Sequence, residues 1–211
     1  MNETLRTRNR RGEGGKLRDD ILAGAAALLE RTGSEEAVTL RAVAREVGIS
    51  APSIYAHFPD REAIVAAIVD DAFADFNAAI KAGSDAPATA GPLARLRGGC
   101  AAYLRFAAQR PNRYRLLFER RDVLVDDTQP VPAIRLESFN WLIASLQACI
   151  DAGISASTDA ARDATAIWVA LHGYATLHAL LPGFPWPDTD ALLDRIVDSL
   201  AQVRPETPLS T

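Results

Sequence analysis

The chain has 211 residues, of which 48% are hydrophobic and 24% are charged, and its formal net charge is −4 at pH 7. These proportions are ordinary for a globular protein with one sizeable domain, or with a small domain joined to a medium one. The sequence holds no run of about 18 apolar residues, and no apolar segment follows its arginine-rich start. We therefore expect a cytoplasmic, nucleoid-associated protein with neither a membrane span nor a secretory signal.

Charge is distributed unevenly along the chain. Residues 1–18 carry six basic and two acidic side chains, although the whole chain is acidic. Such asymmetry is expected where one end of a protein meets a polyanion, and a solvated tail would have the same composition. We predict that residues 1–15 form a flexible basic arm.

Apolar residues recur at spacings of three and four along the chain, and alternating β-branched runs are missing. This pattern predicts an all-α fold of about nine helices. The first amphipathic helix is expected over 16–32. A two-turn helix should then begin after the N-cap Thr39 and end at Gly48. A third, very short helix is predicted over 51–58, with Ser50 as its cap.

A fourth helix is predicted over 61–83, with Asp60 as its N-cap. Residues 82–92 lack a periodic apolar face and are rich in glycine, proline and alanine, so we predict that they form a connecting loop. Five more helical patterns follow, at about 93–109, 112–119, 131–152, 158–181 and 189–203. The sequence thus indicates a small N-terminal helical domain followed by a larger one.

Residues 39–58 have the features of a helix-turn-helix unit. Gly48 permits the turn, while Ile54 and Phe58 are apolar anchors for the second helix. The outward side chains of that helix lack bulk or large charge, so it could lie deep in a DNA major groove. Its N-terminal amides would favour a nearby phosphate.

The segment TLRAVAREVGISAPSIYAHFPDREAIVAAI resembles the DNA-binding region of TetR-family transcriptional regulators. The resemblance implies a helix-turn-helix DNA-binding domain over 16–62, a regulatory and dimerisation domain over 63–204 and a tail at 205–211. It implies DNA contacts from seven residues: Arg41, Ala51, Pro52, Ser53, Tyr55, His57 and Arg61. Few of these side chains can read a base edge, so we expect DNA shape and half-site spacing to supply much of the specificity.

A second segment, AIWVALHGYATLHAL at 166–180, resembles the Trp-x-x-x-His-Gly (WHG) helix of one TetR subgroup. Trp168, His172 and Gly173 carry this similarity. The inducers of that subgroup are mostly undefined, so the resemblance identifies no ligand.

The helix predicted over 131–152 is apolar on more than one face, which places it at the centre of its domain. Family members hold an inducer pocket there, and each aromatic residue nearby could line that pocket or belong to the core. The pocket candidates are Tyr103, Phe106, Phe118, Phe139, Trp141, Trp168 and His172. Because few charges fall inside, we expect an unknown small-molecule effector that is largely apolar or aromatic.

The last two predicted helices carry small or apolar stripes that would suit close helix packing. In TetR-family proteins the equivalent helices form a four-helix interface between two chains. The interface candidates are Ala170, Gly173, Leu177, Leu193, Ile196 and Leu200. The alternative is that both stripes belong to the core of a single chain. A homodimer matches the expectation of a palindromic DNA operator.

No catalytic constellation is recognisable, so we expect neither enzymatic activity nor a cofactor or metal site. The favoured hypothesis is a sequence-specific, DNA-binding transcriptional regulator, by default a repressor released from its operator by the ligand. Two alternatives stay open. The protein could be a helical small-molecule binding protein that does not bind DNA, or a thiol redox sensor that uses Cys100 and Cys149.

Overall fold

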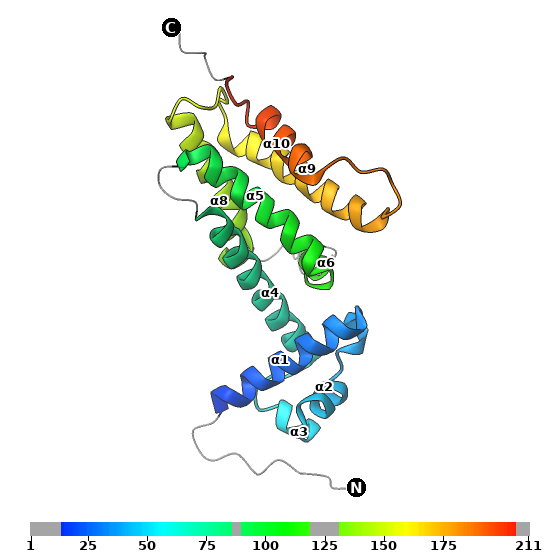
Figure 1. Cartoon of the computed structure of the whole chain (residues 1–211). Coiled ribbons are helices and arrows are strands. Elements are labelled where there is room, and N and C mark those ends of the chain that lie inside the picture. Colours follow the sequence, from blue (N-terminus) through cyan, green and yellow to red (C-terminus); the bar gives the residue numbers. More distant parts are fainter. Residues whose placement is uncertain (1–13, 86–89, 119–130, 206–211) are drawn as a thin grey trace, which may run out of the picture. The chain divides into compact units, whose positions relative to one another are not determined.

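The computed structural model describes residues 14–85, 90–118 and 131–205. In these ranges the chain forms nine α-helices, a short 3-10 helix and a single isolated bridge between Ser155 and Val203 (Figure 1). The elements are α1 (Gly14–Thr32), η1 (Glu35–Ala37), α2 (Leu40–Val47), α3 (Ala51–Ile54), α4 (Arg61–Ser84), α5 (Gly91–Gln109), α6 (Pro111–Phe118), α8 (Ala133–Asp151), α9 (Ala160–Leu180) and α10 (Thr189–Leu200). The predicted all-α fold is confirmed. None of the described helices is long and apolar enough to cross a membrane.

Local capping signals set most boundaries in the N-terminal part. The Thr39 hydroxyl accepts a hydrogen bond from the Ala42 amide at 3.2 Å, and Asp60 Oδ1 accepts one from the Ala63 amide at 2.7 Å. Gly48 has a φ of 73°, a left-handed conformation that costs glycine little. Thr39 therefore begins α2, Gly48 ends it and Asp60 begins α4, as the sequence predicts.

The third helix differs from its prediction in two respects. It ends at Ile54 rather than at Phe58, and residues 55–57 continue as a turn. Ser50 occupies the N-cap position, but its hydroxyl bonds the Ser53 hydroxyl at 2.7 Å instead of a backbone amide. The predicted side-chain cap at Ser50 is thus wrong, because a second hydroxyl one turn away competes for the same oxygen.

The chain divides into two compact units, and the division falls inside α4. Among the described residues, the N-terminal unit holds 14–72 and 115–118, and the C-terminal unit holds 73–85, 90–114 and 131–205. Helix α4 therefore contributes its first half to one unit and its second half to the other.

The core of the N-terminal unit lies among α1, α2, α3 and the start of α4. One isoleucine or valine from each helix is completely buried there: Ile21, Val43, Ile54 and Ile64. Each such side chain contributes roughly 1.5–3 kcal/mol by leaving water. Gly24 lets α1 approach α2, since a Cβ at this position would lie 2.6 Å from Val47 Cγ2.

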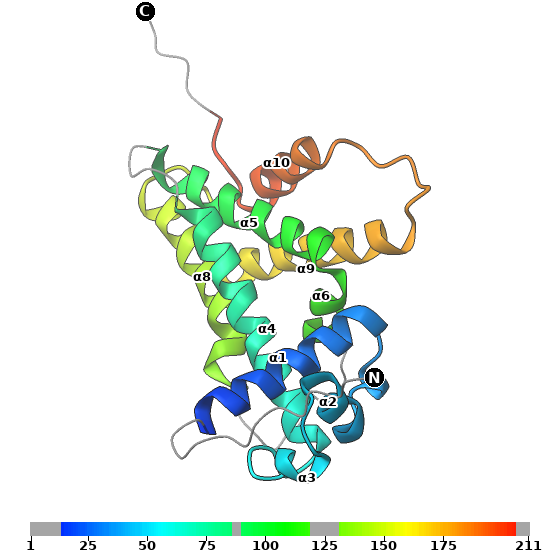
Figure 2. The same ribbon diagram turned by 60° about the horizontal axis from the view of Figure 1, so that its bottom comes forward.

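In the C-terminal unit α5 is the most buried helix, and it packs against α8, α9 and α10 (Figures 1 and 2). Its glycines permit close neighbours. The Trp141 ring of α8 lies on Gly99, and the backbone of Gly98 meets that of Gly83 on α4. The prediction that the helix near 131–152 lies at the centre is wrong. Only Leu142, Leu146 and Cys149 of α8 are buried, because α8 covers α5 with one face.

Candidate DNA-binding surface and effector site

Helix α3 is held by its apolar side and presents a polar and aromatic side outward. Ile54 is fully buried and Phe58 is 3% exposed, so both anchor the segment in the core of the N-terminal unit. The Arg18 guanidinium lies over the Phe58 ring, 5.0 Å from its centroid. The outward residues Pro52 and Tyr55 are exposed, whereas Ala51, Ser53 and His57 are partly exposed.

Tyr55 does not close the small core, although it is a large aromatic residue. Its exposed fraction of 58% is high for a tyrosine in a compact helical unit. A tyrosine presented in this way offers a phenolic hydroxyl to a phosphate and a ring face to a sugar. Arg41 on α2 is also exposed and makes no hydrogen bond or ion pair with any described residue. Both side chains are therefore available to a partner.

Arg61 has an internal role that sequence reasoning missed. Its Nε donates to the Val38 carbonyl oxygen at 3.1 Å, and its Nη2 donates to the Glu35 carbonyl oxygen at 2.8 Å. Nη2 also lies 3.3 Å from the Glu35 carboxylate. The guanidinium thus ties the first turn of α4 to η1 and the segment that follows it.

In the C-terminal unit a buried polar cluster joins three helices. The Tyr114 hydroxyl of α6 lies 2.8 Å from the Tyr103 hydroxyl of α5 and 2.8 Å from Nδ1 of His172 on α9. Tyr103 and Tyr114 are only 5% and 6% exposed. Burial, and then the neighbouring Tyr114, raise the pKa of Tyr103 well above its ordinary value, so this hydroxyl keeps its proton as a donor.

Aromatic rings extend this cluster. The Phe139 and Trp168 rings meet edge to face with centroids 5.7 Å apart, and Trp168 lies 6.3 Å from the His172 ring. Four of the predicted pocket residues are therefore connected: Tyr103, Phe139, Trp168 and His172. Tyr114, which joins them, was missed because its arginine neighbours in the sequence NRYRLL suggest an exposed helix.

The other three pocket candidates lie elsewhere. Trp141 packs on Gly99 and thereby fixes α8 to α5. Phe106 is 4% exposed and packs against Phe76 with ring centroids 5.2 Å apart. Phe118 belongs to the N-terminal unit. The aromatic residues thus serve helix packing as well as the buried cluster.

One face of α9 is apolar and exposed. Val169, Leu177 and Leu180 are 59%, 48% and 69% exposed, and a Cβ at Gly173 would meet no atom within 4 Å. Ala170, Ile196 and Leu200 are partly exposed. Leu193, in contrast, is 4% exposed within the single chain. Its predicted place in an interface is wrong, because α10 turns Leu193 and Val197 toward the core of its own unit.

The two cysteines lie inside the C-terminal unit. Cys100 and Cys149 are both buried and free. Burial, and then the neighbouring Cys149, raise the pKa of Cys100 to about 12, and burial raises the pKa of Cys149 as well. Because the thiolate is the reactive form of cysteine, this environment disfavours a thiol redox sensor.

Comparisons with known proteins agree with this arrangement. Residues 21–68 match the family of bacterial regulatory proteins of the tetR family. Residues 96–200 match the tetracyclin repressor-like C-terminal domain. The chain belongs to the TetR family. It is thus a DNA-binding transcriptional regulator, a class of protein that is normally not enzymatic. Its place in the WHG subgroup stays a prediction, and no curated protein matches the sequence.

Solved structures share the TetR fold over nearly the whole chain. A Rhodococcus sp. RHA1 protein of unknown function is 25% identical, with a TM-score of 0.77, and the match covers 92% of this chain and 98% of that one. The TetR-family regulator PfmR from Thermus thermophilus is 22% identical, with a TM-score of 0.63 and coverages of 87% and 97%. FadR from Bacillus subtilis, solved in complex with stearoyl-CoA, is 17% identical, with a TM-score of 0.68 and coverages of 87% and 97%.

Proposed function

We propose that the protein is a homodimeric repressor that a small, largely apolar ligand releases from a palindromic operator. The observation that carries the ligand part of this proposal is the buried cluster of Tyr103, Tyr114 and His172. The Trp168 ring lies beside the His172 imidazole, and the Phe139 ring meets the Trp168 ring edge to face. A few convergent polar groups among aromatic side chains are typical of a small-molecule site.

The DNA part of the proposal rests on the surface around α3. We assign DNA contacts to the seven residues that the sequence predicts, within a DNA-binding domain over 16–62. Tyr55 is exposed, and Arg41 has no partner among the described residues. The Ser53 hydroxyl is shared with Ser50, so base reading by this side chain competes with an internal hydrogen bond. Recognition by DNA shape is favoured by this scarcity of base-reading groups.

The dimer part rests on the exposed apolar face of α9. A contiguous set of large apolar side chains on a helix surface marks an interaction site more often than a solvated face. A second copy of the chain would cover Val169, Leu177 and the open surface at Gly173. Two copies would also present two α3 helices to the two halves of a palindrome.

Release follows from linkage between the two binding events. The protein has one state that binds DNA and one that does not, and the ligand binds the second state more tightly. The difference between its binding free energies for the two states is the amount by which the ligand weakens DNA binding. About 1.4 kcal/mol of such preference changes the affinity tenfold. The sign of the effect on transcription follows from where the operator lies relative to a promoter.

The test combines operator selection with a salt series. Selection from random duplex DNA gives a site, and fluorescence anisotropy then gives the affinity at several salt concentrations. We expect a steep negative slope of log K against log salt, and a slope smaller by about 1 for Arg41→Ala. Arg195→Ala, an exposed cation on α10, is the matched control and should leave the slope unchanged. A flat salt dependence, or no selected site, would refute the DNA assignment.

Repression is measured separately with a reporter gene under the selected operator. Expression should fall when the protein is supplied, and Tyr55→Ala should restore it. A rise in expression on supplying the protein would identify an activator and would leave the DNA surface standing.

A further inference from the structure

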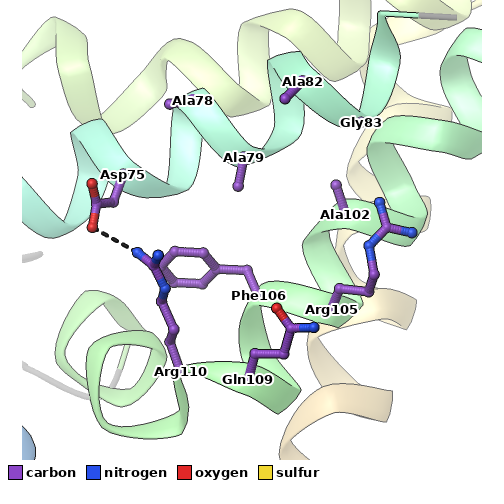
Figure 3. Close-up of a pocket in the computed structure, with 10 residues that line it drawn as sticks. All are labelled: Asp75, Ala78, Ala79, Ala82, Gly83, Ala102, Arg105, Phe106, Gln109 and Arg110. Carbon is purple, nitrogen blue, oxygen red and sulfur yellow. Dashed lines mark hydrogen bonds and ion pairs between the residues drawn. The ribbon is translucent and has the colours of Figure 1, made fainter.

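A cavity of about 460 Å³ lies between α4 and α5 in the C-terminal unit (Figure 3). At one end the two helices touch, since a Cβ at Gly83 would lie 2.5 Å from the Ala102 Cβ and 2.7 Å from the Gly98 carbonyl oxygen. At the other end Arg110 Nη1 is ion-paired with the Asp75 carboxylate at 2.7 Å. The space is therefore a slot with a closed end and a charged end.

The slot exists because the residues facing it are small. Alanines of α4 and α5 line it, and Figure 3 shows Ala79 and the Phe106 ring facing the space between the helices. The Arg110 guanidinium stacks 5.6 Å from the centroid of the Phe106 ring. The lining is therefore partly apolar and partly polar, and the slot is open to solvent along part of its length. Its volume falls within the range of roughly 300–1,000 Å³ that is usual for small-molecule sites.

One cation on this slot has no counter-ion within the described part of the chain. Arg110 and Arg113 both pair with Asp75, and Arg97 of α5 pairs with Asp194 and Asp198. Arg105 and Gln109 also line the slot, one helical turn apart on α5, and neither side chain has a hydrogen-bond partner or an ion pair among the described residues. The guanidinium of Arg105 and the primary amide of Gln109 both carry N–H donors suited to an anionic group.

We propose that this slot binds an organic acid. The carboxylate would lie on Arg105 and Gln109, and the apolar body would extend over the alanines toward Gly83. This site is separate from the cluster of Tyr103, Tyr114 and His172, so the proposal does not depend on the effector site proposed above. Arg105 supplies the charge selectivity, because a guanidinium binds a carboxylate in a bidentate manner and binds a neutral amide only weakly.

Isothermal titration calorimetry of the full chain tests this assignment with three probes. Octanoate carries both the charge and the apolar body, octanamide carries only the body, and acetate carries only the charge. We expect octanoate to bind at least about tenfold more tightly than either of the others, because a charge-assisted pair and apolar burial each contribute that much. Equal affinities for octanoate and octanamide, or no octanoate binding at millimolar concentration, would overturn the proposal.

Two substitutions test the two features of the slot separately, its charge and its free volume. Arg105→Gln removes the charge, and Ala79→Leu fills the slot while it keeps the charge; each should weaken octanoate binding at least about tenfold. Arg95→Gln, an exposed cation of α5 outside the slot, is the matched control and should not change it. Thermal unfolding of each variant establishes that it is folded. If octanoate binding survives both substitutions but is lost in Tyr114→Phe, the acid binds at the buried cluster and the slot assignment is wrong.

Discussion

The Trp141 ring of α8 occupies the space that any side chain at Gly99 of α5 would need. This contact explains why the most buried helix of the C-terminal unit carries glycines at its centre. Without a Cβ at residue 99, the indole can lie directly on the α5 backbone and bring α8 close. The cost in helix propensity, about 1 kcal/mol for a glycine, is offset by the packing of a large ring on the α5 backbone.

Gly99→Ala should destabilise the protein by about 1–3 kcal/mol, because the added methyl group forces the Trp141 ring and α8 to move. The matched control is Gly15→Ala in α1, where a Cβ meets no atom within 4 Å and helix propensity improves. Urea unfolding at a fixed protein concentration measures both. Equal stabilities of the two variants would contradict the packing assigned to Trp141.

Tyr114→Phe should lower stability by about 1–3 kcal/mol, because it removes the hydroxyl that pairs with both Tyr103 and His172. Tyr174→Phe is the comparison, since the Tyr174 hydroxyl bonds only the Thr189 hydroxyl at 2.8 Å in a partly exposed place. Removal of the Tyr174 hydroxyl should therefore lower the free energy of unfolding by less than removal of the Tyr114 hydroxyl. The same denaturant series measures the difference, and a Tyr114→Phe variant as stable as the parent would show that the cluster contributes no net stability.

Arg61→Ala should destabilise the N-terminal unit in the absence of DNA, because the Val38 and Glu35 carbonyl oxygens each lose a hydrogen bond from the guanidinium. Arg61→Lys should recover little, since an ammonium group cannot span both carbonyl oxygens as the planar guanidinium does. Arg41→Ala should change stability by less than about 0.5 kcal/mol and yet weaken DNA binding. Thermal unfolding without DNA distinguishes the structural role of Arg61 from the DNA-binding role of Arg41. If Arg61→Ala unfolds at the temperature of the parent, its contribution is confined to DNA.

Stability should fall as pH rises above 9. Cys100 has a pKa of about 12 in the folded chain, against an ordinary value of 9.0. Between these values the unfolded chain has released the thiol proton that the folded chain retains, so unfolding becomes easier by up to about 1.4 kcal/mol per pH unit. Cys100→Ala removes this contribution. Its stability deficit relative to the parent should therefore shrink between pH 8 and pH 10, and parallel pH profiles would contradict the buried thiol.

Val169→Asp should convert the proposed dimer into a folded monomer, because it places a charge on the exposed apolar face of α9. Ala144→Asp, on the exposed side of α8, is the control for added charge. Light scattering after size-exclusion chromatography gives the mass of each. A Val169→Asp protein that remains dimeric would place the interface on another surface.

Local signals in the sequence were sufficient for the helix-turn-helix region. Caps at Thr39 and Asp60, the left-handed Gly48 and periodic apolar residues depend on neighbours within a few positions. Ser50 shows where such reasoning fails. Its hydroxyl could accept from a backbone amide or bond the Ser53 hydroxyl, and the two alternatives differ too little in energy for the sequence to decide between them.

The arrangement of the C-terminal unit was less predictable, because it depends on which helices meet. Nothing near Gly99 in the sequence indicates that Trp141 will lie on it. Tyr114 lies between two arginines and looks exposed until α5 and α9 cover it. Leu193 follows a regular apolar stripe, yet the stripe alone does not tell whether α10 turns it toward its own unit or toward a second chain.

Because both native cysteines are buried, the chain is suited to site-specific labelling without prior removal of its thiols. A cysteine introduced at Ala56, which is exposed in the turn after α3, would be the one thiol open to a spin label. In the proposed dimer each copy would carry one such label. Electron paramagnetic resonance would then report the separation of the two α3 helices, with and without ligand, as a distance distribution measured in solution.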